Sequence, residues 1–333
     1  MGAIFINSSQ KLSCNLRYIY NPQIIFLKMK MLVTGGAGFI GSWVVDYLIK
    51  AGHKVAVVDN LSTGSINNLN KKANFYKIDI TDKKLKSVFE KEKPDYVFHL
   101  AAQINVRKSI QEPIEDANIN ILGSLNILNN CVKYGVKKII FSSTGGAIYD
   151  EDAPIPVSEN QNAYPKSPYG IAKLTVENYI KFFKLANNLD YTILRYSNVY
   201  GPRQNNKSEA GVVSIFINNI ISNKECVING TGNQTRDYIY VKDVAEANLI
   251  ALHSGGTFNV GTGKEISVNE LLARISSLMK KKASYKHAEA ITGELLRSAL
   301  DSSKLKSAGW SQKYFLDDGL KETIDFFVHK ENQ

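Results

Sequence analysis

The stretch that decides the fold stands near the start of the chain and runs Met31-Leu32-Val33-Thr34-Gly35-Gly36-Ala37-Gly38-Phe39-Ile40-Gly41. Its apolar beginning predicts a short buried strand, and the apolar spacing from Gly38 to Lys50 predicts a helix. The glycines Gly35, Gly38 and Gly41 let the backbone turn tightly and approach a pyrophosphate. The helix start adds free N–H groups and a positive dipole end. This strand, turn and helix therefore predict a dinucleotide site.

An acidic residue follows at the expected distance. The apolar run from Lys54 to Val58 predicts the next strand, and Asp59 ends it, 18 residues beyond Gly41. A carboxylate at this place accepts hydrogen bonds from an adenosine ribose and repels the 2′-phosphate of NADP. The pattern therefore favours NAD. The alternative is a structural glycine turn followed by a helix-capping aspartate.

Strands and helices alternate over the next part of the chain. Further strands are predicted at 75–80, 96–100, 138–142 and 191–196, with helices at 83–90 and 114–134. Such alternation predicts an α/β fold, a doubly wound Rossmann-type parallel sheet with a smaller α/β C-terminal substrate lobe. We expect the dinucleotide domain at 30–195 plus about 236–262, and the lobe at about 196–235 plus 263–330.

Residues 1–28 show no such pattern and carry three basic residues and no acid. We interpret them as an N-terminal extension, produced by an upstream start codon or, alternatively, serving as a transit peptide.

The composition narrows the class of protein. The 333 residues are 44% hydrophobic and 22% charged, as in an ordinary globular protein. Three widely separated cysteines exclude a disulfide framework and a CxxC metal site, so we expect a cytoplasmic protein without a metal. The net charge of +10 is compatible with an anionic small molecule. The lysines are scattered, however, so a solvated basic surface is the simpler interpretation, and no nucleic-acid or membrane partner is expected.

Tyr169 and Lys173 stand four residues apart, so on a helix they share one face. A nearby ammonium favours the phenolate, and we expect it to lower the pKa of Tyr169 so that the phenol acts as a general base. Thr144 ends the strand that begins near Lys138, where its hydroxyl could relay a proton to Tyr169. The alternatives are a chance surface pair and a polar strand end.

These features together resemble the extended short-chain dehydrogenases/reductases, a family of NAD-dependent epimerases and dehydratases, over about residues 30–328. Within it the chain is most similar to the UDP-glucose 4-epimerase branch. The resemblance implies that Thr144, Tyr169 and Lys173 are catalytic. It implies a set of cofactor-binding residues that also includes the catalytic Tyr169 and Lys173: Gly35, Gly38, Phe39, Ile40, Gly41, Asp59, Asn60, Ser62, Thr63, Gly64, Asp79, Ile80, Leu100, Ala101, Ala102, Gln103, Asn120, Ser142 and Tyr196.

For the substrate, the resemblance implies a UDP-sugar held by Thr144, Asn198, Gly211, Val212, Val227, Asn229 and Arg236. A guanidinium suits phosphate oxygens, which makes Arg236 the favoured diphosphate partner. The family's Arg-x-Gly-Asp is replaced here by Ile291-Thr292-Gly293-Glu294, and Arg297 is a candidate substitute for the missing arginine. Ser298 aligns with a position where a bulky residue would exclude N-acetyl sugars.

The implied reaction is 4-epimerisation by transient oxidation at C4, rotation of the sugar and return of the hydride. Gly145-Gly146 stands where 4,6-dehydratases carry an acid pair, which disfavours dehydration. A UDP-glucuronate 4-epimerase, another sugar-nucleotide-modifying enzyme, and a catalytically silent nucleic-acid-binding regulator stay open. By analogy with the family we expect a homodimer that pairs through helices at about 114–134 and 168–187.

Overall fold

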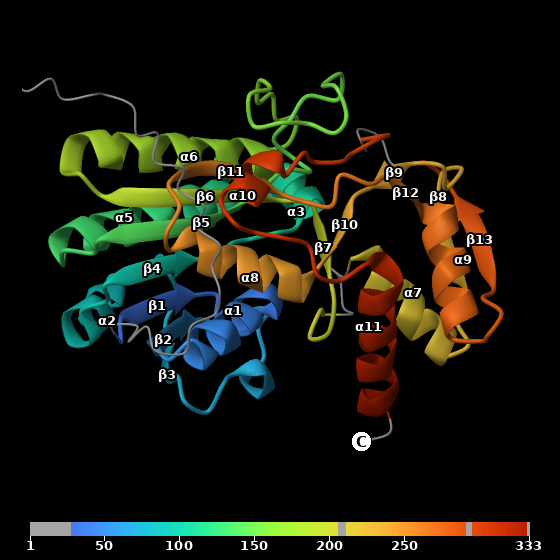
Figure 1. The fold of residues 1–333 in the computed structure, drawn as a ribbon, viewed down its shortest axis with the longest axis horizontal. Helices are drawn as coiled ribbons and strands as arrows, with labels where there is room; N and C mark the ends of the chain where they lie inside the picture. The colour runs from blue at the N-terminus through green and yellow to red at the C-terminus, as the bar shows by residue number, and fades with distance from the viewer. Residues whose placement is uncertain (1–27, 206–210, 291–294, 332–333) are drawn as a thin grey trace, which may run out of the picture.

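The computed structural model describes residues 28–205, 211–290 and 295–331, and in these a parallel sheet lies beside a smaller lobe (Figure 1). The sheet has seven strands in the order β11-β6-β5-β4-β1-β2-β3. Their bounds are β1 (Lys30–Thr34), β2 (Lys54–Asp59), β3 (Asn74–Lys77), β4 (Tyr96–His99), β5 (Lys138–Thr144), β6 (Asp190–Tyr196) and β11 (Gly256–Val260). The predicted doubly wound fold is confirmed.

Helices cover both faces of the sheet, which is why its strands are continuous apolar runs. In β1, Met31 and Val33 pack into one core cluster and Leu32 into the other. The first cluster lies under α1 (Phe39–Lys50) and α8 (Val241–Ala251), and the second under α2 (Leu85–Glu92), α5 (Gly123–Lys133) and α6 (Pro168–Asn187).

The sheet order reverses between β1 and β4, and this places the site. One half of the sheet runs outward from β1 to β3, and the other runs from β4 to β11. Ligands of such sheets bind beyond the carboxyl ends of the strands at the reversal. Here those ends are Thr34 of β1 and His99 of β4, which are paired in register.

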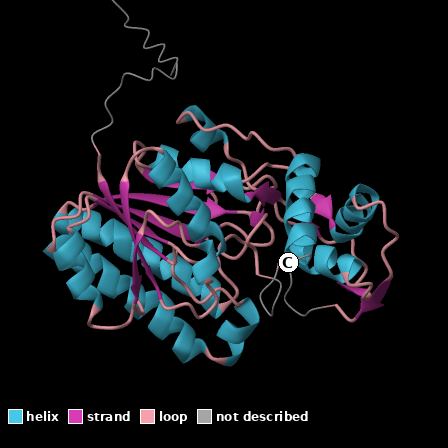
Figure 2. Cartoon of the chain, turned by 90° about the horizontal axis from the view of Figure 1, so that it is seen from below, coloured by secondary structure: helices cyan, strands magenta, loops and turns pink. Residues whose placement is uncertain are grey.

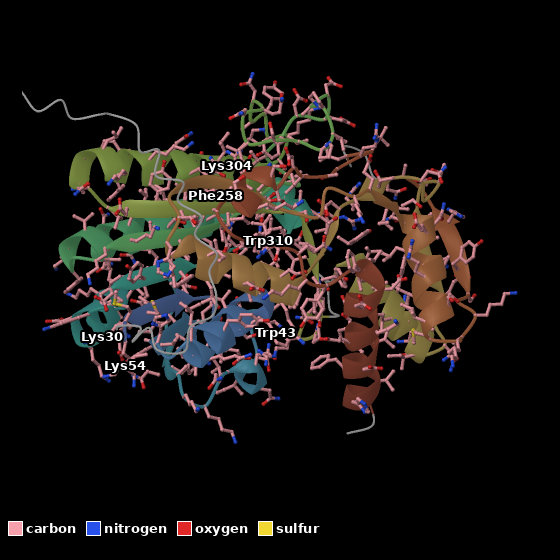
Figure 3. All side chains as sticks on the ribbon, in the orientation of Figure 1. Lys30, Trp43, Lys54, Phe258, Lys304 and Trp310 are labelled. Atoms are coloured by element: carbon pink, nitrogen blue, oxygen red, sulfur yellow. The ribbon has the colours of Figure 1, made fainter. Side chains whose placement is uncertain are left out.

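The edge strand β11 is covered rather than exposed. Lys304 of α10 (Ser303–Ser307) donates its Nζ to the Thr257 carbonyl at 2.7 Å and lies 4.9 Å from the Phe258 ring centre (Figure 3). Trp310 is buried nearby and donates Nε1 to the Asp243 carbonyl at 3.0 Å. Covering the edge removes a site for unwanted strand pairing.

The smaller lobe, made of helices and short strands, lies beside the sheet (Figure 2). It is built from later segments around its own apolar core. Its helices are α7 (Val212–Ile221), α9 (Val268–Leu278) and α11 (Leu316–Glu331). Short strands pair across long stretches of chain: β8 (Cys226–Asn229) with β13 (Tyr285–Ala288), β9 (Thr235–Arg236) with β12 (Ile266–Ser267), and β7 (Asn198–Tyr200) with β10 (Tyr238–Tyr240).

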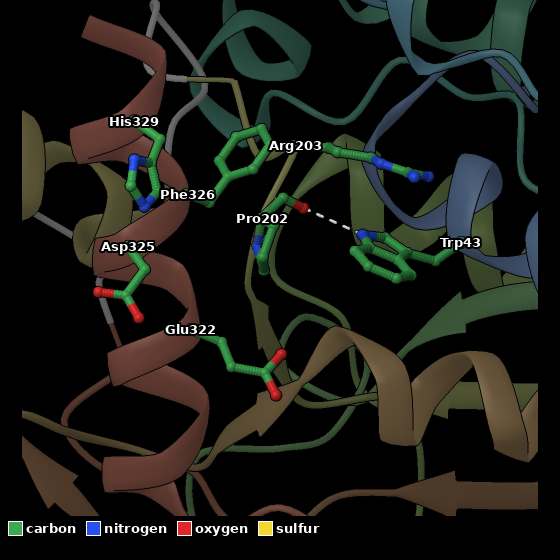
Figure 4. A pocket seen from close by; sticks show the side chains of 7 residues that line it. All are labelled: Trp43, Pro202, Arg203, Glu322, Asp325, Phe326 and His329. Carbon is green, nitrogen blue, oxygen red and sulfur yellow. Dashed lines mark hydrogen bonds between the residues drawn. The ribbon is translucent and has the colours of Figure 1, made fainter. Parts of the chain in front are cut away.

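The two lobes meet at a hollow of about 350 Å³ beside α11 (Figure 4). Trp43 of α1 donates its indole N–H to the Pro202 carbonyl at 3.1 Å. The Arg203 guanidinium lies 4.3 Å from the Trp43 ring centre and pairs with Asp46 at 2.8 Å. These contacts fix the loop after β7 against the first helix of the sheet domain.

Two expectations about elements need correction, and two short helices were missed. The single helix expected at 114–134 is α4 (Pro113–Ala117), a π-helical turn η2 (Asn118–Leu122) and α5. The strand expected at 75–80 ends at Lys77, because the chain turns there and the Ile78 amide donates to the Tyr76 carbonyl. The short helices α3 (Val106–Gln111) and η1 (Ile66–Asn68) were not predicted. Among the described residues no helix has the length and apolarity needed to span a membrane.

Candidate active site

The glycine turn after β1 packs against the chain that leaves β4. Gly35 has a φ of +71°, and a Cβ there would lie 2.7 Å from the Ala101 amide nitrogen. A Cβ on Gly41 would lie 2.1 Å from the Gly35 carbonyl oxygen. The N-cap Gly38 brings no side-chain cap to α1, and the first turn holds no acid. The helix start thus keeps amide donors available for an anion, which fits a dinucleotide pyrophosphate.

Asp59 ties this turn to the end of β2. Its carboxylate is buried and accepts from the Ala37 amide at 3.0 Å and the Leu61 amide at 2.8 Å. Each carboxylate oxygen keeps a second lone pair, which suits a ribose hydroxyl. Asn60, the next residue, donates its amide to the Asp79 carboxylate at 2.6 Å. Asp59 and Asp79, both predicted to bind the cofactor, are therefore brought into one region.

The segment after β4 is held by side chains of β1 and η2. The Thr34 hydroxyl receives the Ala101 amide at 3.3 Å and contacts the His99 ring at 2.8 Å. Burial, aided by the charge of Lys173, lowers the pKa of His99 to about 3, so the ring is neutral. Gln103 and Asn120 exchange hydrogen bonds: the Gln103 amide N–H donates to Asn120 Oδ1, and Asn120 Nδ2 donates to the Gln103 carbonyl, each at 2.9 Å.

The start of α6 positions the predicted catalytic pair. Ser167 caps the helix by accepting the Gly170 amide at 3.2 Å. A Cβ on Gly170 would lie 2.2 Å from the Ala147 carbonyl oxygen, so the helix approaches the chain after β5 closely. This approach brings the Tyr169 side chain close enough to Thr144 for the threonine hydroxyl to act on the pKa of the phenol. Lys173 donates its Nζ to the Ser142 carbonyl at 2.9 Å and lies 5.9 Å from the Tyr169 ring centre.

The expectation that Lys173 lowers the pKa of Tyr169 is wrong for the chain alone. Burial, with the charge of Asp116, raises the pKa of Tyr169, and only Thr144 acts in the other direction. Burial also lowers the pKa of Lys173 to about 8, against the opposing charges of Asp116 and Glu177. Desolvation is therefore the largest contribution to both pKa shifts.

A buried ion pair between Glu177 of α6 and Arg195 of β6 holds the helix to the sheet. It was not predicted from the sequence. Glu177 lies one turn beyond Lys173 and is fully buried. Its carboxylate accepts from Arg195 at 2.6 and 2.9 Å and from the Ser143 hydroxyl at 2.6 Å. Arg195 also donates to the Tyr149 hydroxyl at 2.8 Å. The spacing 169, 173 and 177 could have signalled this third member of the helix face.

Two of the predicted cofactor residues have their side chains engaged within the protein. The Tyr196 phenol is buried and contacts Ser142 Oγ at 3.0 Å and Asn248 Nδ2 at 2.9 Å. Burial raises the pKa of Tyr196 to about 12. These side chains therefore fix the ends of β5 and β6 to each other.

The predicted substrate residues follow the sheet toward the lobe. Asn198 is exposed at the start of β7, with Oδ1 3.9 Å from where a Cβ on Gly146 would lie. Gly211 and Val212 begin α7, and Val227 and Asn229 share one face of β8. The structure therefore places Asn198 near the end of β5 and the other four residues on the lobe.

Arg236 and Arg297 come from neighbouring segments, since the Thr235 amide donates to the Leu296 carbonyl at 2.9 Å. Arg297 is largely exposed and pairs with Glu265, its Nε donating at 2.9 Å. Ser298, which follows it, is buried. The departure at Ile291–Glu294 lies outside the described residues.

Comparisons with known proteins agree with this geometry. Residues 31–261 match the model of the NAD dependent epimerase/dehydratase family. A protein of Methanocaldococcus jannaschii, provisionally named UDP-glucose 4-epimerase, is 47% identical over 89% of this chain and 97% of its own. The structure of a UDP-glucose 4-epimerase from Thermotoga maritima with UDP-glucose has a TM-score of 0.88 and 48% identity, covering 91% of this chain and 100% of its own.

A third similar protein acts on a different sugar. It is the UDP-N-acetylglucosamine 4-epimerase of Methanobrevibacter ruminantium, solved in complex with UDP-N-acetylmuramic acid. Its TM-score is 0.86 at 38% identity, and the match covers 91% of this chain and 99% of its own. Likeness in fold therefore extends to enzymes that handle N-acetylated sugars.

Proposed function

Since the chain belongs to the NAD-dependent epimerase/dehydratase family, we propose that it interconverts the C4 epimers of a UDP-hexose. The observation that carries this proposal is the strand end at Thr144, which meets Tyr169 and is followed by two glycines. A Cβ on Gly145 would lie 2.4 Å from Leu300, so an acidic side chain there would not fit without rearrangement. Dehydration of the sugar is thereby disfavoured.

In this proposal Tyr169 is the general base, and the cationic nicotinamide of bound NAD would lower the phenol pKa that burial raises in the chain alone. Tyr169 takes the proton of the sugar's 4-hydroxyl, with the Thr144 hydroxyl relaying it, and gives a proton back when the 4-keto sugar is reduced. Bound NAD supplies the hydride acceptor and donor for C4. Lys173 places a positive charge behind the phenol and holds the end of β5 through the Ser142 carbonyl.

The residues proposed to hold NAD are those around the glycine turn and the ends of β2 and β4. The start of α1 faces the pyrophosphate, and Asp59 takes the adenosine ribose. The segment from Leu100 to Gln103, fixed by Thr34 and Asn120, supports the nicotinamide half. The glycine turn, Asp59 and the segment from Leu100 stand at the carboxyl ends of β1, β2 and β4, which are neighbouring strands.

The UDP moiety is proposed to lie toward the lobe, with Arg236 on the diphosphate. Asn198, Gly211, Val212, Val227 and Asn229 are proposed to contact the rest of the nucleotide. Arg297 is a second candidate phosphate ligand, although Glu265 neutralises its charge in the ligand-free chain. A small residue at Ser298 leaves room for an N-acetyl group, so we expect activity on both the plain and the N-acetylated sugar.

The test is epimerisation of UDP-galactose and UDP-N-acetylgalactosamine by purified protein without added NAD. Turnover is expected on both substrates, with the Y169F variant slower by about 10² to 10⁴. Turnover of UDP-galactose alone would contradict the interpretation of Ser298. If neither substrate reacts even with NAD supplied, the proposed activity is wrong, and UDP-glucuronate and then nucleic acid are the next ligands to try.

We also propose that two chains associate through α4, η2 and α6. Together with α3, these elements expose several large apolar side chains, and residues between Gln111 and Leu122 line a groove. The exposed residues are Ile110, Ile114, Leu122, Ile171, Phe182 and Leu185. Patches of this kind on a folded protein mark interaction sites.

A cytoplasmic location is proposed as well, since Cys131 and Cys226 are buried free thiols.

A further inference from the structure

Asp116 is a buried carboxylate that the proposed reaction does not use. It lies in α4 and is 1% exposed. Its Oδ1 accepts from Gln103 Nε2 at 2.8 Å and from Asn120 Nδ2 at 2.9 Å. Within the described part of the chain these donors are neutral amides, which satisfy the oxygen and leave the negative charge in place. A buried charge is costly unless nearby groups compensate it.

The groups that face Asp116 are those of the proton-transfer site. Helix α4 packs against α6, and the charge of Asp116 acts on both Tyr169 and Lys173. Glu177 approaches Lys173 from one turn further along α6, and the neutral His99 lies behind Lys173 on β4.

The remaining charged groups near α4 turn toward solvent. Lys108 of α3 pairs with Glu115 at 3.0 Å and with Glu112 at 3.6 Å at the surface, and Arg107 is exposed. Asp116 is therefore the carboxylate of α4 that acts on the catalytic pair from the interior.

We propose that Asp116 is a positioning residue that fixes the amides of Asn120 and Gln103 and sets the pH range in which the Tyr169–Lys173 pair works. This inference rests on the proposed function. The physical reason is that a negative charge disfavours the phenolate and favours the ammonium. Both groups then keep their protons to higher pH than they would without Asp116.

The test is the pH dependence of kcat for the NAD-loaded enzyme and its D116N variant. The carboxamide keeps an oxygen for both donors, removes the charge and turns the second oxygen into an NH2 group. Both limbs of the profile should move to lower pH by about one unit. Well below the acid midpoint the variant should be up to about tenfold faster than the wild type, with KM unchanged near its optimum.

A second measurement needs no substrate. The tyrosinate ultraviolet absorption that is absent from Y169F reports ionisation of Tyr169 in the NAD-loaded protein. In D116N this signal should appear at lower pH than in the wild type. D116S, which also removes the charge and keeps an acceptor oxygen, should show the same displacement if D116N folds poorly.

The control is E115Q, which removes a charge from the neighbouring surface residue and should leave both measurements unchanged. If D116N is slower at every pH with both limbs in place, Asp116 is merely structural and the proposal fails. Should the wild type epimerise no UDP-sugar, the proposed function fails, yet the tyrosinate titration still decides whether Asp116 controls the phenol.

Discussion

Lys173 shows at the residue scale how burial of a proposed catalytic group costs stability. Its side chain is 5% exposed, and burial lowers its pKa to about 8. In the unfolded chain a lysine keeps its proton to about pH 10.4. Between these two values the unfolded state binds more protons, so the stability of the protein should rise with pH. Below pH 8 the folded protein must hold a buried ammonium.

The substitution Lys173→Met should therefore stabilise the protein at pH 7 while abolishing activity. Removal of the buried charge contributes about 3 kcal/mol, and the Ser142 carbonyl left without its donor costs about 1 to 2 kcal/mol. Urea denaturation at pH 7 and near pH 10, on protein freed of dinucleotide, measures the difference. The difference in the free energy of unfolding between K173M and the wild type should shrink as the pH rises.

Lys184→Met is the matched control, because Lys184 lies on the same helix and is 39% exposed. This variant should differ little from the wild type at either pH. A K173M protein that is less stable than the wild type at pH 7 would contradict the argument.

At the element scale, the turn after β5 shows how packing restricts which side chains a position accepts. A Cβ on Gly145 would lie 2.4 and 2.7 Å from the methyl carbons of Leu300, which is fully buried. At Gly146 the nearest atom is Asn198 Oδ1 at 3.9 Å. An added methyl group would therefore overlap Leu300 at Gly145, whereas it would meet only ordinary contact at Gly146.

We expect Gly145→Ala to lower the free energy of unfolding by about 1 to 3 kcal/mol, because the added methyl overpacks the site. Gly146→Ala should change it much less. Thermal denaturation of the two variants makes the comparison, and each serves as the other's control. Equal losses would mean that Leu300 can move aside.

The elements that the sequence predicted well are those with a local signal. The strands of the sheet are buried on both faces, so runs such as Lys54–Val58 stand out as continuous apolar segments. The π-helical turn η2 has no such signal, and the bonds between the Asn120 side chain and Gln103 join residues 17 apart in the sequence. The lobe strands were not predicted either, because each is short and pairs with a distant segment.

The residues of the candidate site likewise fall into those that the sequence reveals and those that only the structure reveals. Gly35, Asp59, Tyr169 and Lys173 belong to spacing patterns that sequence alone reveals. Asp116 stands in a short helix with no motif of its own, and its importance comes only from the packing of α4 on α6. Ionisation was the poorest prediction, because burial that a sequence does not display controls the pKa of Tyr169.

At the scale of the whole molecule, one buried aspartate joins the lobes. Asp237 is fully buried and accepts backbone N–H groups from Thr262, Gly263 and Leu300 at 2.9 to 3.1 Å. Strand β11 and helix α8 meanwhile return to the sheet domain. The chain therefore crosses between the lobes more than once, which holds the proposed nucleotide side of the site against the catalytic side.

The association of two chains is the prediction that belongs to this scale. Ile114 and Leu185 are 85% and 88% exposed, and Phe182 is 57% exposed. Helix α4 packs against α6, and burial of these exposed side chains in a dimer would remove apolar area from water. A stable dimer buries about 1,200 to 2,000 Å² in total, which surfaces of two helices per chain can supply.

Light scattering of the purified protein should accordingly give twice the mass of one chain. The double substitution Ile114→Asp and Phe182→Asp should give monomers, because four charges would then be buried in the interface. Tyr285→Asp, on an exposed strand of the lobe, is the control and should leave the dimer intact. A wild-type protein that is monomeric at micromolar concentration would show that this apolar surface has another role. If the double variant is monomeric and keeps the wild-type melting temperature, each chain folds without help from the interface.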